Sequence, residues 1–246
     1  MKQKLKLKHL NFVLDEDKKN IADLMVDILG YKNSILGKAK FFASSYVKIK
    51  RLIHDVNSID YTKIPLNENS HIKKPNTVNE ISYLQMLNLK SLTETETNLS
   101  MSKYMAKVIG ICTYKENRNS QYNPDSKSFK LYLENLLEIN MFDMVALYNW
   151  ILQDLKETSK KWDELFMSVY VEDKALQNAG GEALSQFNVI NTILSTCNDF
   201  NLNDEEAMYK SYNLIMQTSY SKAYSGYIQE NIRIAKEAEY ERNKKK

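Results

Sequence analysis

Apolar residues recur at alternating spacings of four and three residues along most of this 246-residue chain. Such spacing places the apolar side chains on one face of a helix, so it predicts helices that pack through that face. The most regular seam lies within residues 35–56, and the longest lies within 141–174. The first seam consists of Ile35, Ala39, Phe42, Tyr46, Ile49, Ile53 and Val56. The second predicts a helix of about 50 Å, which ends at Gly180 and Gly181.

The same spacing predicts shorter helices elsewhere in the chain. We expect them at residues 15–30, 81–92, 101–112, 126–137 and 187–197, and a last helix or helix pair at 204–242. Capping signals mark three of the helix starts. Thr77 with Glu80 and Asn203 with Glu206 match the capping box, and Asp125 is the expected cap before residue 126.

Only the N-terminus has the period of a strand. Leu5 and Leu7 alternate with Lys4, Lys6 and Lys8, which is typical of a half-exposed strand. Because the sequence offers no obvious partner strand, an extended arm fits equally well. The predicted fold is therefore mainly α: seven to nine helices in a bundle-like array, with a short N-terminal β-strand or arm.

Proline, asparagine and charge mark a boundary at residues 57–77, which hold two of the three prolines. Residues 1–74 carry 15 Lys and Arg against 8 Asp and Glu, and residues 75–246 carry 19 against 23. We predict a basic N-terminal helical region at 1–60, a linker at 61–77 and a main helical domain at 78–246. Parts of net charge +7 and −4 attract copies of each other or an acidic partner. A solvated surface with uneven charge gives the same numbers.

The residues that usually carry chemistry are sparse. None of His9, His54 and His71 lies within four residues of another histidine or a cysteine, so we expect no metal site. Six glycines form neither of the usual phosphate-binding loops, so no nucleotide cofactor is expected. Cys112 and Cys197 fall on apolar helical faces, where they act as small hydrophobes. We predict no catalytic residue and no cofactor.

The absence of long apolar stretches and the scarcity of arginine indicate the compartment and the kind of partner. No unbroken apolar stretch resembles a signal peptide or a membrane-spanning helix, which predicts an intracellular, soluble protein. Arginine reads phosphates and bases better than lysine does, and the chain has 4 Arg against 30 Lys. We therefore expect neither a membrane nor a nucleic acid as partner.

Tyrosine is the least ordinary feature of the composition, with 16 residues. Tyr220, Tyr224 and Tyr227 gather on the last predicted helix and are the candidate partner-binding residues. Tyrosine buries a large area while keeping a polar tip, which suits a protein interface. The rim of a helix-bundle core suits it as well, and both interpretations remain open.

Two stretches resemble assembly proteins of tailed bacteriophages. Residues 76–92 (NTVNEISYLQMLNLKSL) and 105–114 (MAKVIGICTY) are similar to a short adaptor-like module in such proteins. Residues 187–215 (FNVINTILSTCNDFNLNDEEAMYKSYNLI) and the charged end resemble small helical phage tail proteins encoded near the tape-measure protein. Baseplate-hub assembly proteins of contractile-tailed phages are a related comparison, although this chain lacks the zinc-ligand cysteines of some of them.

The resemblance implies a non-enzymatic assembly chaperone in the host cytoplasm, whose partners are other tail or baseplate proteins. A structural virion component, such as a neck, ring or baseplate subunit, is the alternative, and a homo-oligomer fits either. A third hypothesis is an enzyme whose site is assembled from residues far apart in the sequence. The scarcity of histidine and glycine argues against it.

Overall fold

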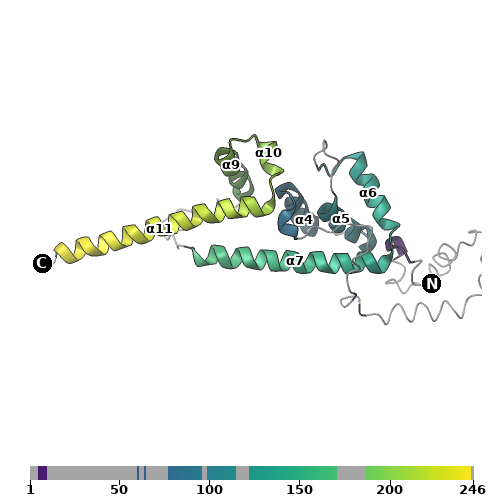
Figure 1. Ribbon diagram of the computed structural model, residues 1–246, viewed down its shortest axis with the longest axis horizontal. Coiled ribbons are helices and arrows are strands. Elements are labelled where there is room, and N and C mark those ends of the chain that lie inside the picture. Colours follow the sequence, from purple (N-terminus) through teal and green to yellow (C-terminus); the bar gives the residue numbers. More distant parts are fainter. Residues whose placement is uncertain are drawn as a thin grey trace, which may run out of the picture. The chain divides into compact units, whose positions relative to one another are not determined.

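The computed structural model of this protein describes residues 5–9, 60, 64, 77–95, 99–114, 122–170 and 187–244. These residues are mainly helical and contain no β-strand, which confirms the predicted fold class (Figure 1). Two 3₁₀ helices, η2 and η4, accompany seven α-helices in this part of the chain. The elements are η2 (Leu7–His9), η4 (Val78–Glu80), α4 (Tyr83–Thr95), α5 (Met101–Thr113), α6 (Lys127–Leu137), α7 (Met141–Ser168), α9 (Asn188–Phe200), α10 (Asp204–Met208) and α11 (Tyr212–Lys244).

The chain forms two compact units, and each is discontinuous in sequence. The first unit joins Met1–Pro75 to Asn88–Gln153, and the second joins Asn76–Leu87 to Asp154–Lys246. The predicted helices at 15–30 and 35–56 lie outside the described residues, as does most of the predicted loop at 57–77. The predicted division into 1–60, 61–77 and 78–246 stays a prediction.

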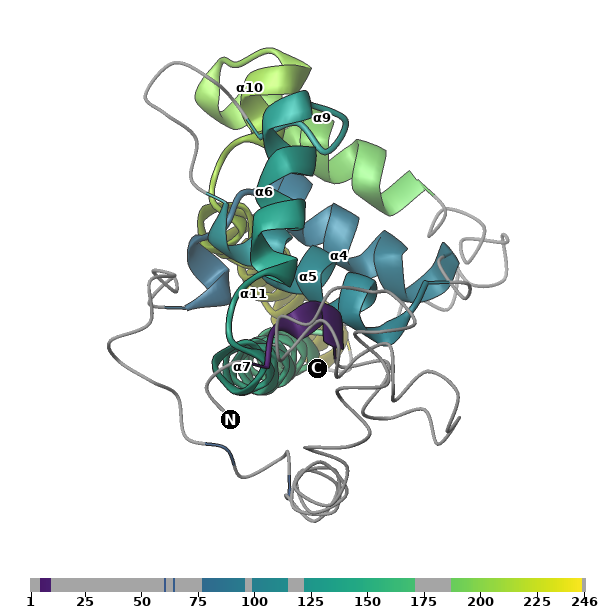
Figure 2. The ribbon, with the colours of Figure 1, turned by 90° about the vertical axis from the view of Figure 1, so that its right-hand side faces the viewer.

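In the first unit, α5 packs against α6, and both helices contact η2 (Figure 2). The predicted seam of α5 is buried at Met105, Val108 and Cys112. Gly110 lies on the side of α5 that faces α6, where a Cβ atom would collide with the Leu133 Cδ2 atom. A glycine at this position therefore allows the two helices to approach closely.

The alternation at the N-terminus is present, but the predicted strand is not. Leu5 and Leu7 are fully buried, and Lys6 makes a single antiparallel bridge with Asn140 before the chain turns into η2. The Leu7 N–H donates to the Ile139 carbonyl at 2.8 Å. The turn between α6 and α7 is too short to pair as a strand, so the contact is limited to one bridge. Residues 5–7 are nevertheless attached to this turn and do not form a free arm.

Lysine side chains reinforce this attachment. Lys6 and Lys8 both form ion pairs with Glu138, which follows α6, the second at 3.0 Å. The hydrogen bonds from Lys6 and then Lys8 hold the pKa of the Glu138 carboxyl below its ordinary value. The alternating lysines thus contact one acidic group while the leucines enter the core.

Two predicted helix ends are wrong. The N-cap of α6 is Ser126, whose Oγ accepts the Phe129 N–H at 3.1 Å, and not Asp125. Helix α7 ends at Ser168, well before Gly180 and Gly181. Hydrogen bonds to the carbonyl three residues earlier tighten the chain there, and the helix is about 42 Å long.

In the second unit, η4 is attached to the C-terminal half of α7. Thr77 caps η4 by accepting the Asn79 N–H, so the predicted cap starts this 3₁₀ helix rather than α4. Thr77 Oγ1 and the Val78 N–H both donate to the Asp154 carboxylate, at 3.1 Å and 2.6 Å. The Trp162 Nε1–H donates to the Asn79 side chain at 3.1 Å. Polar bonds from Thr77, Val78 and Asn79 thus fix η4 against α7.

The start of α4 is joined to the start of α11. The Tyr83 N–H donates to the Lys210 carbonyl at 2.9 Å, and the Tyr212 N–H donates to the Ile81 carbonyl at 2.8 Å. The rings of Tyr83 and Tyr212 stack, with centroids 6.3 Å apart and planes 9° from parallel. Both tyrosines are buried, so this pair belongs to the core of the unit.

The region predicted as a last helix or helix pair at 204–242 is a pair, α10 and α11. Asn203 caps α10 in a complete capping box with Glu206, which confirms that sequence signal. Asn201 ends α9 in the left-handed region at φ 51°, a conformation that asparagine tolerates better than most residues. None of the helices in the described ranges combines the length and apolar character needed to cross a membrane.

Candidate partner-binding surfaces

The three tyrosines singled out in the sequence lie in one row of aromatic rings. The row begins on α7 with Trp162 and Phe166, whose centroids are 6.4 Å apart. It passes to α11 at Tyr220, which meets Phe166 edge to face at 5.8 Å. Tyr224 and Tyr227 follow, with successive centroid distances of 6.1 Å and 6.4 Å. Such edge and tilted geometries are the favoured ones for aromatic pairs.

The row is most buried at Trp162 and most exposed at Tyr224. Trp162 is 3% exposed, Tyr220 and Tyr227 are half-buried, and Tyr224 is 48% exposed. The structure therefore assigns Tyr220 to the rim of the core and leaves Tyr224 accessible. A role for these tyrosines in partner binding stays a prediction.

Helix α9 presents a second accessible surface, which we call the α9 apolar face. Five large apolar side chains of this region are each between 38% and 54% exposed. They are Phe187, Val189, Ile190, Leu194 and Phe200. Exposed apolar side chains that lie close together in the chain are a feature of many sites that bind another protein.

Part of the polar side of α9 packs inward, while Asn188, Asn191 and Asn198 are exposed. Thr196 is buried, at 3% exposed. Lys222 of α11 forms an ion pair with Asp199 at 2.6 Å and donates a hydrogen bond to Ser195 Oγ. An amphipathic helix normally buries its apolar face, whereas α9 leaves most of its large apolar side chains exposed and half-buries Ile193 and Cys197.

Local hydrogen bonds explain how a polar helix face can be buried. Thr192 Oγ1 donates to the Asn188 carbonyl at 2.7 Å, and Thr196 Oγ1 donates to the Thr192 carbonyl at 2.8 Å. Each hydroxyl is satisfied within its own helix, so burial leaves no unpaired donor. The sequence predicts this helix correctly but does not indicate which face packs inward. The sequence signal that could have indicated the packed side is the group of small Ser and Thr residues at 192, 195 and 196.

An acidic group borders the α9 apolar face. The half-exposed Cys197 lies at the C-terminal end of the face, and its Sγ–H donates to Asp204 Oδ1 at 3.5 Å. Partial desolvation and then this hydrogen bond raise the pKa of the Cys197 thiol. The thiol is therefore protonated at neutral pH. The negative charge at this end of the α9 apolar face is that of the Asp204 carboxylate.

Metal-ligating and nucleophilic side chains are the remaining candidates for chemistry among the described residues. Within these ranges, no group of three or more His, Cys, Asp or Glu residues could hold a metal ion. Cys112 is buried in α5, and His54 and His71 lie outside the described part of the chain. The α9 apolar face and the aromatic row are thus the features to which a function can be attached.

No family model, curated protein or solved structure matches the chain. Functional inference therefore rests on the geometry of these two surfaces and on the sequence.

Proposed function

We propose that this chain is a non-enzymatic bacteriophage protein that acts in tail or baseplate assembly as a chaperone. It binds a client through the α9 apolar face and covers apolar surface on that client until the client is assembled. The observation that carries the proposal is the exposure of large apolar side chains along α9. The phage setting rests on the resemblance of residues 76–92, 105–114 and 187–215.

The shape of the face indicates what it can bind. Helix α9 has 13 residues and is about 20 Å long, so it presents a narrow apolar ridge. A ridge of this kind fits between two helices of a client or into an apolar groove. Asp204 at one end favours a client with a lysine or arginine at the corresponding position. Binding of this kind shields the client without any chemical step.

The alternative is a permanent virion component in a neck, ring or baseplate. It is favoured by the lengths of α7 and α11, which have 28 and 33 residues. Helices of this length are suited to packing between subunits.

Quantitative mass spectrometry of purified particles and of infected-cell lysate separates the two. An assembly chaperone should be abundant in the lysate and missing from particles. A virion component should be present in particles at a fixed multiple of a tail protein. If the protein accompanies no phage infection at all, the phage proposal is wrong.

A pair of variants tests the α9 apolar face directly. Ile190→Gln combined with Leu194→Gln makes the centre of the face polar, and Leu131→Gln makes the same change at an exposed position on α6. We expect the double variant to lose particle assembly in a phage complementation assay, and Leu131→Gln to retain it. Normal assembly with the double variant would exclude α9 as the client site.

A further inference from the structure

The C-terminal part of α11 is an exposed helix. Figure 1 shows that α11 continues past the end of α7. From residue 228 to 244 every side chain is exposed except Glu230, which is half-buried. Isolated helices of this length are marginally stable in water, and most helices are stabilised by packing an apolar face. This segment contains apolar residues whose packing partner is not among the described residues.

Four apolar residues and one asparagine of α11 follow a heptad repeat, while the exposed Ile228, Ile232 and Tyr240 lie outside it. Tyr224, Tyr227, Asn231, Ile234 and Ala238 are separated by three, four, three and four residues. They occupy successive a, d, a, d and a positions. A sustained 4–3 seam is typical of a two-stranded coiled coil, and one asparagine at an a position specifies a register and oligomeric state.

The structure shows where this seam begins and the sequence shows where it ends. The preceding d position, Tyr220, is covered by Phe166 of α7 at 5.8 Å. The next a position, Tyr224, is 48% exposed. The following d position after Ala238 is Glu241, which is charged and ends the seam. The exposed part of the seam therefore extends from 224 to 238, with Tyr227 half-buried within it.

Charges beside the seam favour a second copy in parallel orientation. Glu237 occupies a g position and Arg242 the next e position. In a parallel dimer a g residue faces the e residue of the following heptad on the other helix. Glu237 then faces Arg242 of the partner subunit, twice by symmetry. The other acidic g residue, Glu230, faces an alanine, so no like charges oppose each other. An antiparallel pair instead brings the acidic g positions opposite one another.

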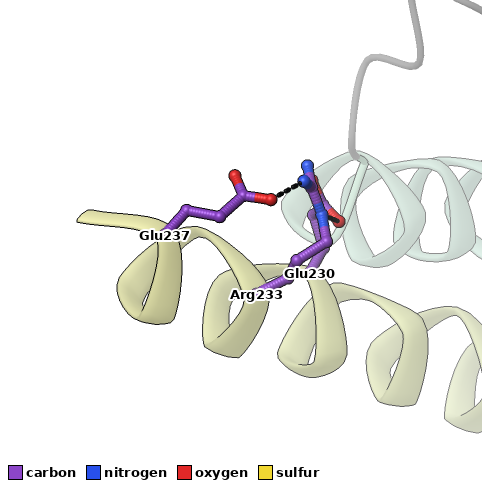
Figure 3. Close-up of polar contacts among 3 residues, drawn as sticks. All are labelled: Glu230, Arg233 and Glu237. Carbon is purple, nitrogen blue, oxygen red and sulfur yellow. Dashed lines mark hydrogen bonds and ion pairs between the residues drawn. The ribbon is translucent and has the colours of Figure 1, made fainter. Parts of the chain in front are cut away.

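Arg233 holds both g carboxylates in place (Figure 3). Its guanidinium forms two hydrogen bonds with Glu230, at 2.8 Å and 2.6 Å, and an ion pair with Glu237 through Oε1. These contacts keep the pKa of the Glu230 carboxyl below its ordinary value. The pairs at i, i+3 and i, i+4 also support an otherwise exposed helix.

We propose that residues 224–242 of α11 pair with the same segment of a second copy of this chain, as a parallel, in-register, two-stranded coiled coil. The seam has only five positions, so the dimer is weak and depends on concentration. The proposal is independent of the client-binding function, because it uses α11 and not the α9 apolar face.

Disulfide crosslinking tests the pairing and its orientation. The full chain carries Cys197→Ser to remove the half-exposed thiol, together with either Ile234→Cys or Ile232→Cys. Ile234 is at a d position and Ile232 at a b position, yet the two are 51% and 49% exposed, which makes them a matched pair. Under mild oxidation we expect a crosslinked dimer from Ile234→Cys and none from Ile232→Cys, because d residues meet across a parallel seam. Equal crosslinking of the two variants, or none, overturns the proposal.

A charge exchange measured by sedimentation tests the register. Arg242→Glu places two like-charged pairs across the seam, and we expect the dimer to weaken roughly tenfold. Adding Glu237→Arg restores opposite charges across the seam, so the double variant should recover most of the affinity. A wild-type chain that sediments as a monomer at every concentration overturns the proposal, as does a double variant that is weaker than Arg242→Glu alone.

Discussion

At the scale of single residues, two helical glycines occupy opposite environments. A Cβ atom at Gly110 would collide with Leu133, while one at Gly226 has nothing within 4 Å. We expect Gly226→Ala to raise the free energy of unfolding by about 0.5–1 kcal/mol, because alanine favours the helix. Gly110→Ala should lack most of this gain, because the Leu133 side chain must shift to admit the new methyl group.

Urea denaturation of the two variants measures this difference. The combination of Gly110→Ala with Leu133→Ala serves as the control, because it removes the colliding methyl group. If Gly110→Ala stabilises the chain as much as Gly226→Ala does, the close approach of α5 and α6 does not require a glycine at position 110.

Burial of Tyr212 predicts a dependence of stability on alkaline pH. Burial, followed by the proximity of Tyr83 and of Asp163, raises the pKa of Tyr212 to about 12. A tyrosine in the unfolded chain titrates near 10. The fold thus favours the neutral phenol, and the resulting stability is complete below pH ~10 and is lost as the pH rises through ~12.

The Tyr212→Phe variant isolates this effect, because it keeps the stacked ring and removes the hydroxyl. We expect thermal stability to fall less between pH ~10 and ~12 in this variant than in the wild type. Parallel curves for the two proteins would show that Tyr212 does not titrate with folding.

Individual residues also show where sequence reasoning stops. The capping box at Asn203 could be predicted because it requires only that Asn203 and Glu206 are three residues apart, which can be read directly from the sequence. Asp125 and Ser126 are both good N-cap types, and only the backbone decides which of them precedes the first helical turn. The N-terminal leucines were predicted to alternate, but their single bridge depends on the turn at Asn140, far away in the chain.

At the scale of elements, the exposure of apolar residues on α9 predicts that polar substitutions there have little effect on the free energy of unfolding. Ile190→Gln with Leu194→Gln should change the free energy of unfolding by no more than about 0.5 kcal/mol, because both side chains are exposed. Thr196→Gln should cost about 1–3 kcal/mol, because the buried site has no room for a longer side chain.

Chemical denaturation of both variants checks this reversal of the ordinary pattern. A large loss in the double variant would mean that the α9 apolar face is covered in the isolated chain.

Helix positions were predictable, because periodicity is a local property. The structure contains helices where the sequence predicted them at 101–112, 126–137 and 187–197. The face by which a helix packs is not local. For α9 it depends on Lys222 and on threonine hydroxyls that are satisfied within the helix. The seam of residues 187–197 could therefore be recognised, but its exposure could not.

At the scale of the whole molecule, pairing through α11 makes stability depend on protein concentration. A dimer formed only by the folded chain is favoured by mass action. We expect the unfolding temperature, followed by the helical circular dichroism signal, to rise with concentration in the wild type. Ile234→Asp should abolish this dependence by placing a charge at a d position. A wild-type midpoint that is constant with concentration would argue against the dimer.

The two cysteines have a practical consequence. Cys112 is buried and Cys197 is half-exposed, so the unmodified protein has a single position for a fluorophore. Only the thiolate reacts, and the raised pKa of Cys197 makes labelling slow at neutral pH and controllable by mild alkalinity. The dye would lie at the end of the α9 apolar face, where its emission reports directly whether a client occupies that face.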